Sequence, residues 1–178
     1  MAPAYRVVAR DAEISPDGAY RWRLSRTLAV GFGRVVWVML NPSTADSAVD
    51  DPTVRRCVGF SAVWGFSEVV VVNLFALRAT DPAALRAHPD PVGPLNDANI
   101  WAACDPAEAR CVVMAWGTHG RLQGRGLAVE EGLRRRGAPR LSALGWTRGG
   151  EPRHPLYMRA DARPLPLEAR LGVAERRS

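Results

Sequence analysis

The chain has 178 residues, 47% of them hydrophobic, and a formal net charge of +6. This length and composition favour one globular domain with a single core. No apolar run reaches the roughly 18 residues of a membrane span, and residues 1–6 lack the apolar core of a signal peptide, so we expect a cytoplasmic protein with no membrane partner and no obligate protein partner.

The N-terminal part has the pattern of strands and turns. Over residues 20–25, apolar residues alternate with Arg and Ser, which predicts a strand with one apolar and one basic face. The Ser-Pro-Asp-Gly run at 15–18 predicts a turn before it. The Gly-Phe-Gly run at 31–33 precedes a strand, whereas a phosphate-binding loop follows one, so we interpret it as a second turn. Residues 35–40 form a continuous valine-rich run, typical of a central strand covered on both faces.

Helices and strands alternate along the rest of the chain. Asp51 followed by Pro52 is typical of a helix start, and this helix is expected to run to about Trp64. The elements expected after it are a buried strand over 68–74, a short helix that begins at Asp81 and Pro82, a loop over 89–94, a helix over 95–104, a buried strand over 111–115, a helix over 122–136 and a short strand over 139–144. On the helix over 122–136, we expect Leu127 to face inward and Glu130 to face outward.

This alternation predicts an α/β fold. We expect a three-layer α/β/α sandwich around a central, mostly parallel four-stranded sheet. Residues 1–162 would form a single α/β domain, and the tail over 163–178, which is rich in Pro and Arg, would be poorly ordered.

Cysteine and arginine usage narrow the classes of cofactor and partner. The three cysteines, Cys57, Cys104 and Cys111, cannot all pair and form no Cys-x-x-Cys, which argues against a structural zinc or a four-cysteine iron–sulfur cluster. We expect buried free thiols and neither a cofactor nor a metal. The chain has no lysine, and arginine binds phosphate bidentately and stacks on bases. This basic charge fits a nucleic-acid partner, although a GC-rich genome would produce the same composition.

Four short blocks carry the polar residues of greatest interest. They are Leu40-Asn41-Pro42-Ser43, Val72-Asn73-Leu74, Ala115-Trp116-Gly117-Thr118-His119 and His154-Pro155-Leu156. The first three end apolar runs, and ligands of open α/β sheets bind beyond the carboxyl ends of the strands. We therefore expect Asn41 and His154 to lie across one cleft, with Asn73 at its floor.

The four blocks, in this order and at about this spacing, resemble the uracil-DNA glycosylase superfamily over roughly residues 34–160. The first block is similar to the Asn-Pro element of the mismatch-specific branch. The second and third are similar to an apolar-Asn element and a Trp-Gly-Ser-His element, and the fourth matches part of a late His-Pro-Ser-Pro element. The blocks also resemble an uncharacterised bacterial family with Leu-Asn-Pro-Ser-Thr-Ala-Asp and Pro-Arg-His-Pro-Leu-Tyr runs.

The resemblance implies a DNA glycosylase that hydrolyses the N-glycosidic bond of uracil or a related damaged base, with DNA carrying that base as its partner. Asn41 would position the attacking water, and His154 would donate a hydrogen bond to the base carbonyl as charge develops. A carboxamide cannot take the proton of the water, so we expect a slower enzyme than one with Asp at position 41. The enzyme would be monofunctional, because no lysine is present to form a Schiff base with the sugar.

The resemblance also implies base and DNA contacts. Asn73 would read the pyrimidine edge, because its amide offers a donor beside an acceptor. Phe60 would stack on the flipped base, and Pro42 and Ser43 would complete the base site. The residues expected to contact DNA are Arg55, Arg56, Arg78 and Arg153, which would hold phosphates, and Leu156 and Tyr157, which would fill the hole left by the flipped base.

Simpler and competing interpretations stay open. Asn-Pro after a strand is an ordinary turn pattern, Phe60 fits a core position as well as a stacking one, and His119 fits a structural role in a Gly-rich loop better than a catalytic one. A catalytically weak or inactive nucleobase- or nucleotide-binding protein of the same fold is one alternative. A metal-dependent phosphodiesterase built on Asp46, Asp50 and Asp51 is another.

Overall fold

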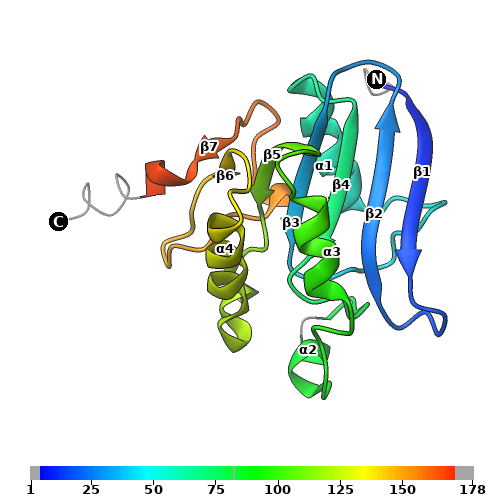
Figure 1. Cartoon of the computed structure of the whole chain (residues 1–178), viewed down its shortest axis with the longest axis vertical. Coiled ribbons are helices and arrows are strands. Elements are labelled where there is room, and N and C mark those ends of the chain that lie inside the picture. The colour runs from blue at the N-terminus through cyan, green and yellow to red at the C-terminus, as the bar shows by residue number, and fades with distance from the viewer. Residues whose placement is uncertain (1–4, 82, 171–178) are drawn as a thin grey trace.

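A seven-stranded mixed sheet runs through the part of the chain that the computed structural model describes, residues 5–81 and 83–170 (Figure 1). Its strand order is β1-β2-β4-β3-β5-β6-β7. The strands are β1 (Val7–Ile14), β2 (Arg21–Leu28), β3 (Arg34–Met39), β4 (Glu68–Asn73), β5 (Ala109–Met114), β6 (Leu141–Ala143) and β7 (Leu165–Pro166). The helices are α1 (Pro52–Val63), α2 (Ala83–Ala87), α3 (Asn96–Ala103) and α4 (Arg125–Arg135), with 3₁₀ turns η1 (Thr118–Gly124), η2 (Pro155–Tyr157) and η3 (Leu167–Arg170).

The middle of the sheet is parallel and its two edges are antiparallel. Strands β4, β3, β5 and β6 pair in parallel, so that Val36 lies between Val70 and Val112. Strands β1 and β2 extend one edge, and β7 extends the other. The expected α/β fold is therefore confirmed, but the sheet has seven strands in the described residues where four were expected.

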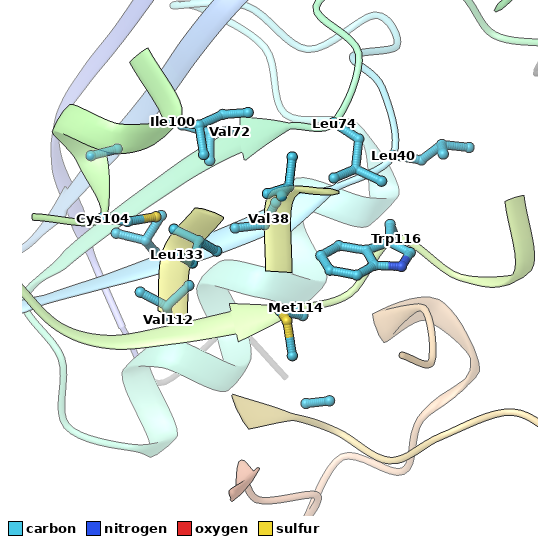
Figure 2. Close-up of a cluster of buried hydrophobic side chains, with 14 of the residues drawn as sticks. Val38, Leu40, Val72, Leu74, Ile100, Cys104, Val112, Met114, Trp116 and Leu133 are labelled. Carbon is cyan, nitrogen blue, oxygen red and sulfur yellow. The ribbon is translucent and has the colours of Figure 1, made fainter. Parts of the chain in front are cut away.

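Helices cover both faces of the parallel strands (Figure 1). Helix α1 packs on one face, in a core that includes Trp37 and Val71. Helices α3 and α4 pack on the other, and Figure 2 shows Val72 of β4 beside Ile100 of α3 and Val112 of β5 beside Leu133 of α4. Because successive strand residues point to opposite faces, two covered faces require the continuous apolar runs seen in the sequence.

The expected helix starts and thiols are present. Asp51 caps α1, with its Oδ1 accepting from the Val54 backbone N–H at 2.7 Å, and Pro52 is the first helical residue. Asp81 caps α2 in the same way, whereas Pro82 lies outside the described residues, as do 1–4 and 171–178. The three cysteines are free and buried, as predicted. No helix among the described residues is long and apolar enough to cross a membrane.

Two sequence expectations are wrong in detail. Helix α4 begins at Arg125 because Leu122 and Gln123 have non-helical backbone angles. Its buried face includes Gly126, Val129 and Glu130, so Glu130 faces inward and Leu127 is 61% exposed. The expected tail also starts too early: residues 163–170 contain β7 and η3, and Leu167 packs in the core. The rest of that tail, 171–178, lies outside the described residues.

Candidate functional site

A cleft of about 680 Å³ opens at the carboxyl ends of the four parallel strands. The segments that follow β3, β4, β5 and β6 all contribute to its lining, as does the N-terminus of α1. This is the end of an α/β sheet at which ligands usually bind, because the loops there converge while the strands hold them rigidly. The cleft is therefore the candidate functional site of the protein.

The structure places Asn41, Asn73 and His154 in this one cleft. Asn41 follows β3, Asn73 is the last residue of β4 and is 1% exposed, and His154 precedes η2. Four other predicted residues line the same cleft: Ser43, Arg153, Leu156 and Tyr157. Predicted residues from two strand ends and a late loop thus line one cleft.

The Asn41 side chain has a fixed orientation. Its Nδ2 donates to the carbonyl oxygens of Pro42, at 3.1 Å, and Ala79, at 2.7 Å. Since a carbonyl oxygen can only accept, the amide nitrogen must face these two groups. The side-chain Oδ1 is left as the acceptor available to a water molecule or a ligand in the cleft.

His154 is held as a neutral imidazole with a defined proton position. Its Nδ1 accepts from the Leu156 backbone N–H at 3.4 Å. Burial lowers the pKa of His154 below its ordinary value, and the nearby Asp51 carboxylate partly offsets this. With Nδ1 acting as an acceptor, the single proton of the neutral ring is on Nε2. His154 therefore offers the cleft one hydrogen-bond donor without a charge.

Two charged residues of the cleft were assigned other roles from the sequence. Arg21, the first residue of β2, was placed on the basic face of the strand predicted over residues 20–25, but it is 2% exposed and lines the cleft. A register shift in the β1–β2 pairing between the partners Arg23 and Arg21 breaks the alternation and turns Arg21 inward. Asp51, interpreted only as a helix cap, also lines the cleft. The sequence pattern that could have identified Asp51 is a helix cap that follows soon after the end of a buried strand.

Phe60 does not belong to the cleft, and its predicted stacking role is wrong. Its ring is 3% exposed and packs against the rings of Trp37 and Trp64, with centroid distances of 6.1 and 5.6 Å, in a cluster in which the two tryptophans also stack on each other. Phe60 lies on α1, whose N-terminal end alone reaches the cleft, and the apolar face of the helix must pack on the sheet. Phe60 is therefore a core residue.

Of the four arginines predicted to bind phosphate, only Arg153 lines the cleft. Arg153 lines the cleft, with its Nε donating to the Trp146 carbonyl at 3.0 Å. Arg56 is turned away from the cleft and donates to the carbonyl oxygens of Pro155 and Met158. Three further predicted residues are outside the cleft lining: Arg55, whose guanidinium donates to the Asp50 carbonyl, Arg78, which donates to the Gly18 carbonyl at 3.3 Å, and Pro42, which is buried.

The acidic cluster of the phosphodiesterase alternative is dispersed. Asp46 accepts from two backbone N–H groups of its own turn, Asp50 pairs with Arg26, and Asp51 caps α1. Among the described residues, no three His, Cys, Asp or Glu side chains are grouped so that they could hold a metal ion. Each carboxylate has a separate structural task, and the arrangement gives this alternative no support.

Comparison with known proteins yields a family but no relative of stated activity. A family model described as "Protein of unknown function (DUF1643)" matches residues 21–156, which include all four sequence blocks. The comparisons with curated proteins and with solved structures give no match.

Proposed function

The chain belongs to the DUF1643 family, whose function is unknown, and we propose from the chemistry of its cleft that it is a DNA glycosylase that hydrolyses the bond between a damaged base and its sugar. The proposal keeps the resemblance to the uracil-DNA glycosylase superfamily and its three-layer architecture. It includes DNA as the partner and a cytoplasmic location, which suits three free thiols. The observation that carries it is the pairing of a free Asn41 oxygen with a neutral His154 donor in one cleft.

The reaction requires an acceptor that orients the attacking water and a donor that binds the departing base, and the cleft holds both. Breaking the base–sugar bond builds positive charge on the sugar and negative charge on the base. The Asn41 Oδ1 can accept a hydrogen bond from the attacking water and orient it, because both carbonyl contacts hold the amide in place. The His154 Nε2–H can donate to a base oxygen as charge grows there, and one such preorganised donor is worth about 3 kcal/mol.

The rim of the cleft has features that suit a DNA strand. Tyr157 is 82% exposed and Leu156 is 43% exposed, although both are large apolar residues. An apolar side chain beside a base pocket can fill the space that a flipped nucleotide leaves in the stack. Arg148 and Arg153, also on the cleft lining, are exposed and able to bind phosphate.

The second candidate is a nucleobase- or nucleotide-binding protein with the same cleft. It is favoured by one observation: Asn41 cannot accept a proton, and the carboxylate of Asp51 is already partly used as a helix cap. A cleft without an effective base would bind its ligand and turn over slowly. Turnover on a defined substrate separates the two functions.

The test uses labelled oligonucleotides that carry one uracil, hypoxanthine, xanthine or mismatched thymine, incubated with and without EDTA and then cleaved with alkali. We expect EDTA-resistant abasic sites with the wild type on at least one substrate, and at least a 100-fold loss in His154→Gln and Asn41→Ala. His88→Gln, outside the cleft on the segment after α2, is the matched control. The proposal is wrong if no substrate yields abasic sites, and tight binding without product would then favour the second candidate.

A further inference from the structure

Two arginines of β2 are buried, and they differ in their ion pairing. Arg26 is fully buried and forms an ion pair with Asp50 at 2.7 Å. Arg21 is 2% exposed but makes no ion pair among the described residues. A buried charge is normally paired, because the cost of removing it from water is large. Arg21 therefore departs from the rule that Arg26 follows, and it does so on the wall of the cleft.

The contacts of Arg21 leave part of its guanidinium unused. One terminal nitrogen donates to the Ala45 carbonyl at 2.7 Å, and the other donates to the Asn73 Oδ1 at 3.5 Å. The Nε–H has no partner although it is buried. An unsatisfied buried donor costs about 1–3 kcal/mol, so this atom is where a ligand would gain most.

Arg21 is cationic at neutral pH. Burial lowers its pKa to about 10, and the charges that act on it are Asp51 and Asp46, which raise the pKa, and Arg78 and Arg26, which lower it. The two carboxylates act from beyond ion-pair distance. The positive charge is thus incompletely balanced by the protein itself.

The floor beside Arg21 presents donors. A guanidinium has no acceptor, so the amide of Asn73 must turn its oxygen toward Arg21, as the structure has it. The remaining Asn73 atom for a ligand is Nδ2, which also donates. This differs from the sequence expectation that Asn73 offers a donor and an acceptor to the base edge.

We propose that Arg21 and Asn73 form an anion site on the cleft floor, which binds the edge of the heterocycle that becomes negatively charged when the glycosidic bond breaks. This inference rests on the proposed glycosylase function. In the step, the bond between the sugar carbon and the base nitrogen breaks, and its electron pair goes to the base. The water oxygen forms the new bond to the sugar carbon and loses a proton to solvent. The base anion, held by Arg21, takes a proton from water as it leaves.

The first experiment measures binding of free bases by calorimetry at pH 7.5. The probes are 5-nitrouracil, which is anionic at this pH, and thymine, which is neutral and similar in shape. We expect the wild type to bind 5-nitrouracil at least 10-fold more tightly than thymine, and Arg21→Gln to lose this preference. Arg21→Lys, which keeps the charge, should retain part of it, and Arg86→Gln on exposed α2 is the control for net charge.

Competition identifies the source of the anion. Inorganic phosphate, added at equal ionic strength, should leave 5-nitrouracil binding unchanged. Phosphate could instead displace 5-nitrouracil from the wild type and from the control Arg86→Gln, but not from Arg21→Gln. In that case the floor of the cleft binds phosphate, and the base-anion proposal is wrong. Equal binding of 5-nitrouracil and thymine by the wild type also overturns it. Thermal melts show whether Arg21→Gln is folded, and the Arg21→Lys result decides if it is not.

A DNA arm keeps this inference separate from the proposed function. With oligonucleotides that carry uracil or the more acidic 5-fluorouracil, Arg21→Gln should lose at least 10-fold more rate on uracil, because the poorer leaving group needs the cation more. An equal loss on both substrates would overturn the role in catalysis. If the wild type cleaves neither, the glycosylase function fails, and the calorimetry alone decides the anion site.

Discussion

Arg26 and Asp50 form a buried ion pair beneath the segment that leads into α1. The Arg26 guanidinium donates to the Asp50 carboxylate at 2.8 Å through Nε, and Arg10 pairs with the second carboxylate oxygen at 2.8 Å. Arg26 also donates to the Asp46 carbonyl at 2.5 Å. These contacts tie β1, β2 and the loop after β3 together, so the pair holds the segment that carries Asp51 into the cleft.

Removing the charge of Asp50 should destabilise the protein strongly. Asp50→Asn leaves Arg26 buried without its counter-ion, and breaking such a pair costs about 3 kcal/mol. Urea unfolding followed by circular dichroism measures the change. The control is Asp11→Asn, whose carboxylate is exposed and 3.8 Å from Arg23, with an expected cost below about 0.5 kcal/mol. Similar losses in the two variants would contradict the assignment.

His154 should titrate below the ordinary histidine range. Because burial lowers its folded pKa, protonation favours the unfolded chain. Its contribution to stability is therefore complete above about pH 6.5, the unfolded pKa, and is lost as the pH falls through the lower folded value. NMR titration of the imidazole signals, assigned with His154→Gln, measures this. A His154 pKa at or above that of a free histidine would show that the ring is not held neutral.

The polar residues at strand ends could be predicted from the sequence, whereas the position of Arg21 in the cleft could not. Asn41 and Asn73 each end an apolar run, so the pattern locates them directly. The inward position of Arg21 was not predicted, because a period-two pattern does not reveal a register shift in the β1–β2 pairing. The role of Phe60 was predicted wrongly because an aromatic residue on an amphipathic helix fits core and pocket equally, and only its packing against Trp37 and Trp64 decides.

Helix α1 contacts the turn that carries His154. Arg56, in the middle of α1, donates to the Pro155 and Met158 carbonyls and stacks over Phe60 at 4.6 Å. A three-residue 3₁₀ turn is weak by itself, so these contacts from α1 help to hold the η2 backbone in place. The arginine predicted to bind phosphate is thus a positioning residue for the loop that carries the histidine.

Arg56→Gln should release this loop and reduce base excision more than stability. A shift of about 1 Å in a catalytic group can cost about 100-fold in rate, whereas the lost hydrogen bonds cost about 1–3 kcal/mol. Abasic-site formation and thermal melts measure the two effects. The neighbouring exposed Arg55→Gln removes the same charge without a contact to η2 and should change the rate less than 3-fold. An equal rate loss in both variants would point to phosphate binding instead.

Element boundaries were predictable where local chemistry sets them. Caps and proline fix the start of α1, and continuous valine runs identify β3 and β4. Strand β7 has only two residues, and it exists because it pairs with β6, a long-range contact that a window of sequence does not contain. The start of α4 depends on backbone angles at Leu122 and Gln123, residues that suit a helix by propensity.

The direction of the parallel strands determines where the polar residues of the cleft meet. Four parallel strands must end on one side, so polar residues from distant parts of the sequence meet there. This convergence follows from the α/β alternation alone. The antiparallel β1 and β2 add Arg21 to the same cleft, and the sequence pattern did not predict that they would contribute to it.

The net charge of +6 and the exposed arginines of the rim lead to a final prediction on DNA binding. Each phosphate contact releases condensed counter-ions, so the logarithm of the binding constant should fall linearly with the logarithm of salt concentration, by about 0.7 per contact for a single strand. Arg148→Gln and Arg153→Gln should each reduce the slope by about 0.7, and Arg86→Gln should not change it, because Arg86 lies outside the cleft. Fluorescence anisotropy with a labelled oligonucleotide at several salt concentrations measures the slopes. If the three variants give the same slope as the wild type, DNA does not cross this rim, and the partner of the cleft is a ligand that enters without a strand.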